Sequence, residues 1–360
     1  MKKNIYYALI IIALFTFSCK SMLLTEDMKN TPTNCFKMLS KTVDENYSFF
    51  DYKHINWDST CRYYKPMVND KMPKDSLYGV LSSMLNSLND GHVNMVTEFD
   101  RSRSWGWYQN YPQNFNFEFL QRTYLKNNTY YTGPLVNTWI DSIGYVHYGS
   151  FGSPIKTEQL NFVLDRFKNS KAIILDMRNN GGGSMANIFQ IMSRFATKKT
   201  YLGQMYRKNG IGHNDFSKGD SIFVKPIERK KDKNGKIKKI EKDAPDTLVT
   251  YLNKPIFILT NRLCYSATNF FVGYMKQLPN VTVIGDQTGG GGGLPISSEL
   301  PNGWRYRFSA TKMILPDGLN IEGGVPSNVQ ISTGPEDELK GIDAMIERVK
   351  LLMINEEMKK

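Results

Sequence analysis

Between residues 141 and 285 the chain alternates short apolar runs with segments of helical periodicity, and this alternation leaves few folds open. Short apolar runs between polar turns are typical of buried strands, and apolar residues at every third or fourth position indicate helices. Strands that alternate with helices are typical of an α/β fold whose active groups lie at strand ends. We therefore expect an α/β core over residues 141–335. The predicted strands cover residues 143–148, 172–176, 255–260 and 281–284, and the predicted helices cover residues 156–168 and 266–277.

A helical region is expected before this core. Apolar residues recur at helical spacing at Leu77, Val80, Leu81, Met84, Leu85 and Leu88. This pattern predicts a small helical domain over residues 20–92, which ends in the turn sequence Asn89-Asp90-Gly91-His92. A connecting segment rich in Asn, Tyr and Trp follows over residues 93–140, with a loop at residues 101–107 and strands after it. The remaining residues, 336–360, are expected to form a C-terminal helix.

Residues 1–18 have the features of an export signal, because two lysines precede an apolar run at residues 5–17. At about 13 residues this run is too short to span a bilayer. The following Ser18-Cys19 resembles the site at which bacterial lipoproteins are cleaved and lipidated, so we expect a lipid anchor on Cys19. The expected location is the bacterial cell envelope, on a membrane that faces the periplasm or the cell surface. The alternative is plain secretion, with Cys19 discarded. In an oxidising compartment Cys35 and Cys61 could form a disulfide.

The formal net charge is +12, from 46 basic and 34 acidic residues, and such a balance raises the question of an anionic partner. Much of the excess lies in residues 228–242, where Asn234-Gly235 is typical of a tight hairpin turn. We interpret this stretch as a solvated surface hairpin in an insertion near residues 205–250. Because no nucleic-acid-binding signature accompanies it, we expect no nucleic acid partner. Contact of the hairpin with an anionic membrane surface is a weaker alternative.

The first candidate site follows the predicted strand 172–176. It has the sequence Asp176-Met-Arg-Asn-Asn-Gly-Gly-Gly-Ser184. Consecutive glycines are expected where backbone amides approach a ligand or where φ is positive. We interpret these amides as donors to an oxyanion, with Asp176 and Arg178 paired to hold the loop. The segment is not a phosphate-binding loop, because the glycines are not followed by the Lys and the Ser or Thr that such a loop needs. A plain strand-to-helix turn remains an alternative.

The second candidate is Ser266, which follows the predicted strand 255–260 at the start of a helix. A hydroxyl at a helix N-terminus lies at the positive end of the macrodipole, which favours a developing alkoxide or oxyanion. The alternative is that Ser266 only caps the helix. Cys264, two residues earlier, is interpreted as a small buried residue and not as a nucleophile.

These two segments, with Val283-Ile-Gly-Asp-Gln-Thr-Gly289 and a late Gly324-Val-Pro, resemble the C-terminal processing (tail-specific) serine peptidases over residues 140–332. The resemblance implies a ClpP/crotonase-like core of mixed sheet and helices, preceded by the small helical domain. It also implies roles for the candidate residues. Ser266 would be the nucleophile, and the oxyanion hole would use the amides of Ala267 and of Gly181 or Gly182.

The chain departs from that family at its general base. Bacterial members carry a lysine where this chain has Gly291, so a Ser/Lys mechanism does not apply. Leu88-Asn-Asp-Gly-His92 resembles the tricorn-like and retinoid-binding-protein-like branch, which implies His92 as the base. Asn320-Ile-Glu322 matches the place of the acidic residue that orients this histidine, and together they would form a Ser/His/Glu triad. The other three histidines, His54, His147 and His213, are expected to be solvated or to belong to the core.

The resemblance thus implies a serine peptidase that cleaves protein or peptide substrates through an acyl-enzyme, and residues 1–18 add the expectation that it is exported. Too few residues separate His92 from the core for a PDZ domain, so none is expected. No Cys and His residues have zinc spacing, so we expect neither a metal nor a cofactor. The alternative function is a catalytically inactive binding protein for an apolar ligand or a peptide on the same scaffold.

Overall fold

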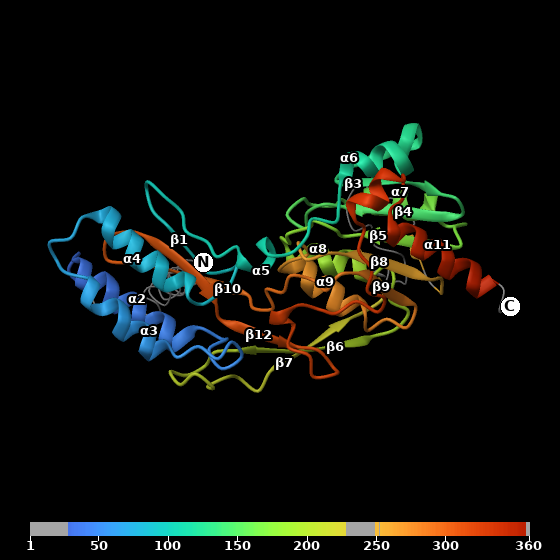
Figure 1. Cartoon of the computed structure of the whole chain (residues 1–360). Helices are drawn as coiled ribbons and strands as arrows, with labels where there is room; N and C mark the ends of the chain where they lie inside the picture. Colours follow the sequence, from blue (N-terminus) through green and yellow to red (C-terminus); the bar gives the residue numbers. More distant parts are fainter. Residues whose placement is uncertain (1–27, 228–248, 252, 358–360) are drawn as a thin grey trace, which may run out of the picture. The chain divides into compact units, whose positions relative to one another are not determined.

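The computed structural model describes residues 28–227, 249–251 and 253–357, and it divides the chain into two compact units (Figure 1). The helical unit comprises the described residues up to Ser104 together with residues 208–215 and 295–310. The core unit comprises residues 105–207, 216–294 and 311–360. The predicted core thus contributes two segments to the helical unit. The export signal, Cys19 and the basic hairpin lie outside the described residues.

The helical unit packs helices against one face of a three-stranded antiparallel sheet. Thr31 begins the first helix by accepting a hydrogen bond from the amide of Asn34, and Pro32 occupies the first helical position. The predicted apolar stripe is buried on α4, where Leu81 and Leu85 face the core. The helices are α2 (Pro32–Asn46), α3 (Trp57–Tyr64) and α4 (Lys74–Asn86), and the strands in sheet order are β1 (Asn94–Val96), β11 (Arg305–Ser309) and β10 (Pro295–Glu299).

The core unit is built on a six-stranded mixed sheet. Its order is β2 (Tyr130–Thr132), β3 (Leu135–Ile140), β4 (Ile143–Tyr148), β5 (Ala172–Asp176), β8 (Ile256–Thr260) and β9 (Val281–Gly285). The first three strands are antiparallel, whereas β4, β5, β8 and β9 run parallel. The predicted strands agree with β4 and β5 and differ from β8 and β9 by one residue at one end.

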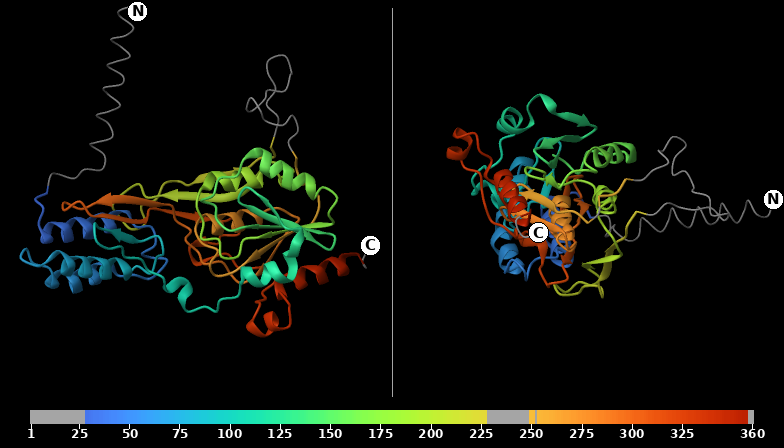
Figure 2. Two further views of the ribbon diagram at one scale, coloured as in Figure 1. Left: turned by 90° about the horizontal axis from the view of Figure 1, so that it is seen from above. Right: turned by 90° about the vertical axis from the view of Figure 1, so that its right-hand side faces the viewer.

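Helices cover both faces of this sheet, as parallel strands require. Figure 2 shows α7 and α11 on opposite sides of it. A second, three-stranded sheet of order β12-β6-β7 completes the unit. These elements are α7 (Thr157–Arg166), α8 (Met185–Met192), α9 (Ala267–Met275), α10 (Pro335–Leu339), α11 (Ala344–Glu357), β6 (Thr200–Arg207), β7 (Asp220–Val224) and β12 (Thr311–Ile314).

Two sequence predictions are wrong in detail. The strands expected after residue 107 form only from residue 130 onward, as β2 and β3, whereas residues 117–125 form helical turns. Asn116 caps these turns by accepting from the amide of Phe119. His213 is not simply solvated, since its Nε2 lies 2.8 Å from Oδ1 of Asp44. Among the described residues, no helix has the length and apolar character needed to cross a bilayer.

Candidate active site

A buried ion-pair cluster holds the start of the glycine loop after β5. The Nη2 atom of Arg178 lies 2.5 Å from Oδ2 of Asp176, and its Nη1 atom lies 2.7 Å from Oδ2 of Asp343, just before α11. Burial raises the pKa of the Asp176 carboxyl, but Arg178 outweighs this effect and holds that pKa below its ordinary value. The predicted pairing of Asp176 with Arg178 is confirmed, and Asp343 is a further partner.

The side chain of Asn180 fixes the next part of the loop. It is fully buried, and its Oδ1 accepts from the amide of Gly182 at 3.0 Å and from the hydroxyl of Thr268 at 2.7 Å. Its Nδ2 donates to the carbonyl of Tyr148 at 2.7 Å. The carbonyl of Asn180 also accepts from the amide of Tyr265. Asn180 therefore ties the glycine loop to the start of α9, a role that our sequence analysis missed.

Ser266 lies at the turn between β8 and α9 with an unusual backbone conformation, φ 55° and ψ −123°. A residue other than glycine rarely has positive φ, and such strain is concentrated at functional sites. Serine nucleophiles of α/β hydrolases sit on sharp strand-to-helix turns of this kind. Its side chain makes no cap hydrogen bond to α9, which lies wholly within the described residues. The interpretation of Ser266 as a simple helix cap is therefore not supported.

The glycine loop approaches this turn closely. A Cβ atom on Gly182 would lie 2.8 Å from the amide nitrogen of Ala267 and 2.9 Å from Cβ of Ser266, so only glycine fits there. The Gly182 amide is engaged by Asn180. Within the described residues, no acceptor is found for the amide of Gly181 or for that of Ala267. Of the two predicted loop amides, Gly181 is thus the better oxyanion donor.

Glu322 lies in the same unit, against the glycine-rich segment 289–293. Its Oε2 accepts from the amide of Gly292 at 2.8 Å, and its carbonyl accepts from the amide of Gly291. The carbonyl of Gly290 in turn accepts from the amide of Ser266 at 3.0 Å. Glu322 is buried, with 6% of the residue exposed, and its carboxylate is held by backbone. The glycine segment therefore connects Glu322 to the Ser266 turn.

The position of the missing lysine is filled by an aromatic ring. A Cβ atom on Gly291 would lie 2.6 Å from Cζ of Tyr265, and Gly291 has φ +78°. The ring of Tyr265 stacks on that of Trp107, with 4.1 Å between the centroids. A side chain at residue 291 has no room, which agrees with the exclusion of a Ser/Lys mechanism.

His92 belongs to the helical unit, two residues before β1. Its ring is buried, and burial lowers its pKa to about 4, against the opposing effect of Asp90. Asp90 is also buried; its carboxylate accepts from the amide of His92 at 2.7 Å and from the hydroxyl of Ser309 at 2.9 Å. A histidine with this pKa is neutral near pH 7, which is the form that a general base requires. Asp90 is not among the residues predicted from the sequence, although an acidic residue two positions before the histidine was a signal.

Two arginines hold the backbone of the His92 turn. The Nε of Arg307 on β11 donates to the carbonyl of His92 at 3.1 Å, and the Nε of Arg103 donates to the carbonyl of Gly91 at 2.8 Å. Both positive charges also lower the pKa of His92. The turn is thus built from hydrogen bonds to residues far apart in the sequence.

Ser266, Ala267, Gly181, Gly182 and Glu322 therefore lie in the core unit, and His92 lies in the helical unit. Cys264 is fully buried, its thiol donates to the carbonyl of Met177, and burial raises its pKa to about 12. The prediction that Cys264 is a small buried residue is confirmed. Among the described residues, no group of three His, Cys, Asp or Glu side chains is arranged to hold a metal ion.

Residues 142–331, just over half of the chain, match the family model of peptidase family S41. The chain belongs to peptidase family S41. Residues 28–86 match the model of the Tricorn protease C1 domain, in agreement with the branch that the His92 turn resembles. The family resemblance and the mixed α/β core with a preceding helical region are therefore confirmed.

Among solved structures, this S41 chain is similar to a candidate peptidase from Parabacteroides merdae ATCC 43184, at 38% identity and a TM-score of 0.81. That match covers 90% of this chain and 97% of the other. Mature CPAF in complex with lactacystin has the same fold at 11% identity and a TM-score of 0.63, and the match covers 90% of this chain and 99% of that one.

A candidate CtpA-like serine protease of Staphylococcus aureus strain N315 is 27% identical over 199 residues. A protein of the same description from Staphylococcus epidermidis is 25% identical over 194 residues. Each match covers 53% of this chain and 34% of the relative, so the similarity extends over about a third of these curated proteins.

Proposed function

We propose that this protein is a serine peptidase that hydrolyses peptide bonds through an acyl-enzyme, with Ser266 as nucleophile, His92 as general base and Glu322 as the acidic member of the triad. The observation that carries the proposal is the backbone of Ser266, whose positive φ holds the residue on a sharp turn beside the glycine loop. Strain of this kind persists only where the surroundings impose it. Membership of peptidase family S41 supports the same reaction class.

In this mechanism neutral His92 takes the proton of the Ser266 hydroxyl while the serine oxygen bonds to the substrate carbonyl carbon. The carbonyl oxygen becomes an oxyanion, which the amides of Gly181 and Ala267 stabilise. The C–N bond then breaks as His92 gives its proton to the leaving amine. Water, activated by the same histidine, releases the acyl group. The pairing of His92 with Ser266 is inferred from the family resemblance, since the two residues belong to different units.

The proposal is tested by labelling the purified protein with a fluorophosphonate probe. We expect labelling of the wild type, none of Ser266→Ala, and at least a 100-fold slower rate for His92→Ala. Ser76→Ala and His54→Asn are matched controls that should label normally, because both residues are exposed and lie outside the candidate site. A folded wild type that does not label would favour the alternative, a binding protein on the same scaffold.

We further propose that the protein is exported and anchored by lipid on Cys19, on the basis of the charged and apolar pattern of residues 1–18. In a bacterial host fed an alkyne-labelled fatty acid, the full chain should incorporate the label and sediment with membranes. Cys19→Ser should lose both properties and Cys61→Ser should keep them. Label that persists in Cys19→Ser would contradict the anchor.

A further inference from the structure

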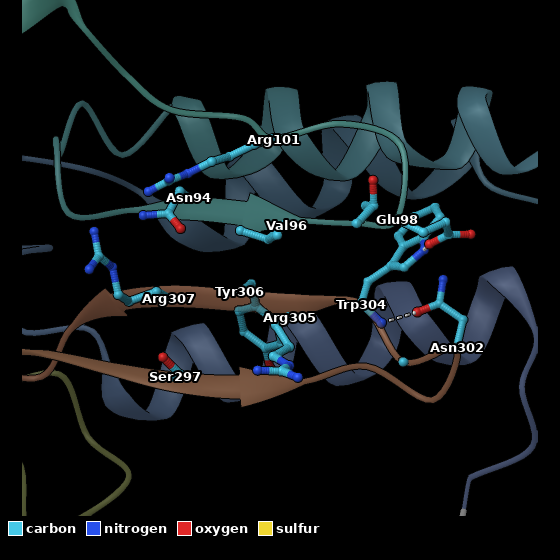
Figure 3. A pocket seen from close by; sticks show the side chains of 12 residues that line it. Asn94, Val96, Glu98, Arg101, Ser297, Asn302, Trp304, Arg305, Tyr306 and Arg307 are labelled. Carbon is cyan, nitrogen blue, oxygen red and sulfur yellow. Dashed lines mark hydrogen bonds between the residues drawn. The ribbon is translucent and has the colours of Figure 1, made fainter.

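The outer face of the sheet in the helical unit carries a cavity lined by arginines. Its volume is about 530 Å³, which is in the range of ligand pockets. Figure 3 shows Arg305 and Arg307 projecting from β11 and Arg101 from the loop after β1, with Asn94 and Ser297 beside them. From these residues we propose that the cavity binds carboxylate groups of a peptide, and so gives the protein a preference for acidic segments.

The sheet register explains why these groups converge. Arg305 and Arg307 are two residues apart on the central strand, so their side chains lie on the same face. Asn94 on one neighbouring strand and Ser297 on the other are both paired with Arg307. The opposite face is fixed in the apolar core through Tyr306 and Phe308. The guanidinium donors of Arg305 and Arg307 therefore lie on one face of β11, and the other face of this strand is packed in the core.

Two carboxylates, those of Glu98 and Glu299, lie near the arginines of the cavity. Glu98 already accepts from Nζ of Lys74 at 3.0 Å and from Nε1 of Trp304 at 2.8 Å. The contact between Arg305 and Glu299 is long, at 3.8 Å, and both side chains are more than half exposed. Exposed ion pairs of this kind contribute little to stability, so a ligand carboxylate can replace Glu299 as the partner of Arg305. Guanidinium groups bind carboxylates with strong, directional hydrogen bonds.

The cavity is next to the proposed general base. Arg307, one of its lining residues, donates to the carbonyl of His92. A peptide carboxylate bound here would lie beside the turn that holds His92, which favours a substrate over an unrelated anion. A concave site also suits a peptide side chain better than a flat membrane surface. The substrate role rests on the proposed peptidase activity, whereas the binding itself does not.

The test is therefore a binding measurement on the full chain carrying Ser266→Ala, by fluorescence anisotropy of labelled octapeptides. A Glu-containing peptide should bind at least 10-fold more tightly than its Gln counterpart, and the difference should shrink in high salt. Adding Arg101→Gln and Arg305→Gln should reduce the preference about 10-fold. Arg307 is left intact because it contacts His92. The matched control is Arg62→Gln, an exposed arginine on α3 outside the cavity, and should leave the preference unchanged.

A charge-reversal variant distinguishes a loss of binding that is specific to the cavity from a loss caused by weakened folding. The Arg305→Glu variant should bind the Glu peptide weakly and a Lys peptide more tightly than the wild type does, and its melting temperature should be unchanged. Amidated C-termini remove the terminal carboxylate from both peptides, so the preference for Glu should be retained. A preference that is lost on amidation would contradict a site for side-chain carboxylates.

Equal binding of Glu and Gln peptides, or a preference that survives in the double arginine variant, would overturn the proposal. Equal peptide binding together with Arg305-dependent binding to phosphatidylglycerol vesicles would overturn it in favour of a membrane surface. Failure of the wild type to label with fluorophosphonate would refute the peptidase proposal alone, because the anisotropy result does not depend on catalysis.

Discussion

The ring of Tyr265 occupies the space into which a side chain at Gly291 would project, with Cζ only 2.6 Å from the position of a Cβ atom. The ring of Trp107 stacks on the ring of Tyr265 and holds it in place. This is the position at which the family resemblance implies a lysine. The packing leaves no room for a side chain there, so any general base must come from elsewhere in the chain.

Restoring the lysine should fail. Gly291→Lys places a side chain at φ +78° and against Tyr265, so we expect the free energy of unfolding to fall by about 2–5 kcal/mol, without faster fluorophosphonate labelling. The melting temperature measures the loss. Gly341→Lys is the matched control, because Gly341 has φ +74° but open space around it, and should be less harmful. An active, stable Gly291→Lys protein would contradict the packing argument.

Asn180 is expected to act as a positioning residue. Asn180→Ala removes the acceptor of the Gly182 amide and of the Thr268 hydroxyl, so the glycine loop should no longer be held in position beside Ser266. By analogy with the loss of one oxyanion donor, kcat on a peptide substrate should fall about 100-fold with little change in KM. Asn187→Ala, which removes another buried amide, is the control for general destabilisation. Equal losses in the two variants would argue for a merely structural role.

The activity should resist acid. Because burial lowers the pKa of His92 from 6.5 to about 4, the imidazole stays neutral and basic until the pH falls well below 6. The labelling rate should therefore stay level from about pH 8 to about pH 5 and decline below it. Arg307→Gln should move the midpoint upward, since Arg307 lowers this pKa, and Asp90→Asn should move it downward. A midpoint near 6.5 in the wild type would refute this account.

The ion-pair cluster behind the glycine loop should matter for stability. Arg178→Met leaves the carboxylates of Asp176 and Asp343 buried without their guanidinium partner, so we expect a loss of about 3–5 kcal/mol. Lys168→Met, which breaks an exposed pair with Asp165, should change stability by less than about 1 kcal/mol. Thermal unfolding of the two variants makes the comparison. Similar melting temperatures would mean that the buried cluster is not stabilising.

Local patterns predicted the central strands well. Residues 143–148 and 172–176 are apolar runs bounded by polar turns, and they form β4 and β5 with the predicted bounds. The glycine loop and the Ser266 turn were predictable for the same reason, because each lies between a buried strand and the helix that follows it. The aromatic residues at 117–125 were misread because a cap at Asn116, and not residue type, decides their conformation.

Long-range partners could not be predicted from the sequence. The contact of Arg178 with Asp343 and that of Arg307 with His92 join residues that no local periodicity relates. The same holds for Asn180, whose role depends on Thr268. Such contacts depend on how strands pair in space, and a single sequence carries no record of that pairing.

The central strand of the helical unit, β11, is also the last of its strands in the chain. When synthesis has reached only Ser104, β1 has no neighbour and the core lacks Tyr306 and Phe308. The first residues to be made must therefore wait for residues 295–310 before their own unit can close. A fragment that stops before Pro295 would expose that unfinished core, which makes it a natural target for chaperones and a poor choice for expression on its own.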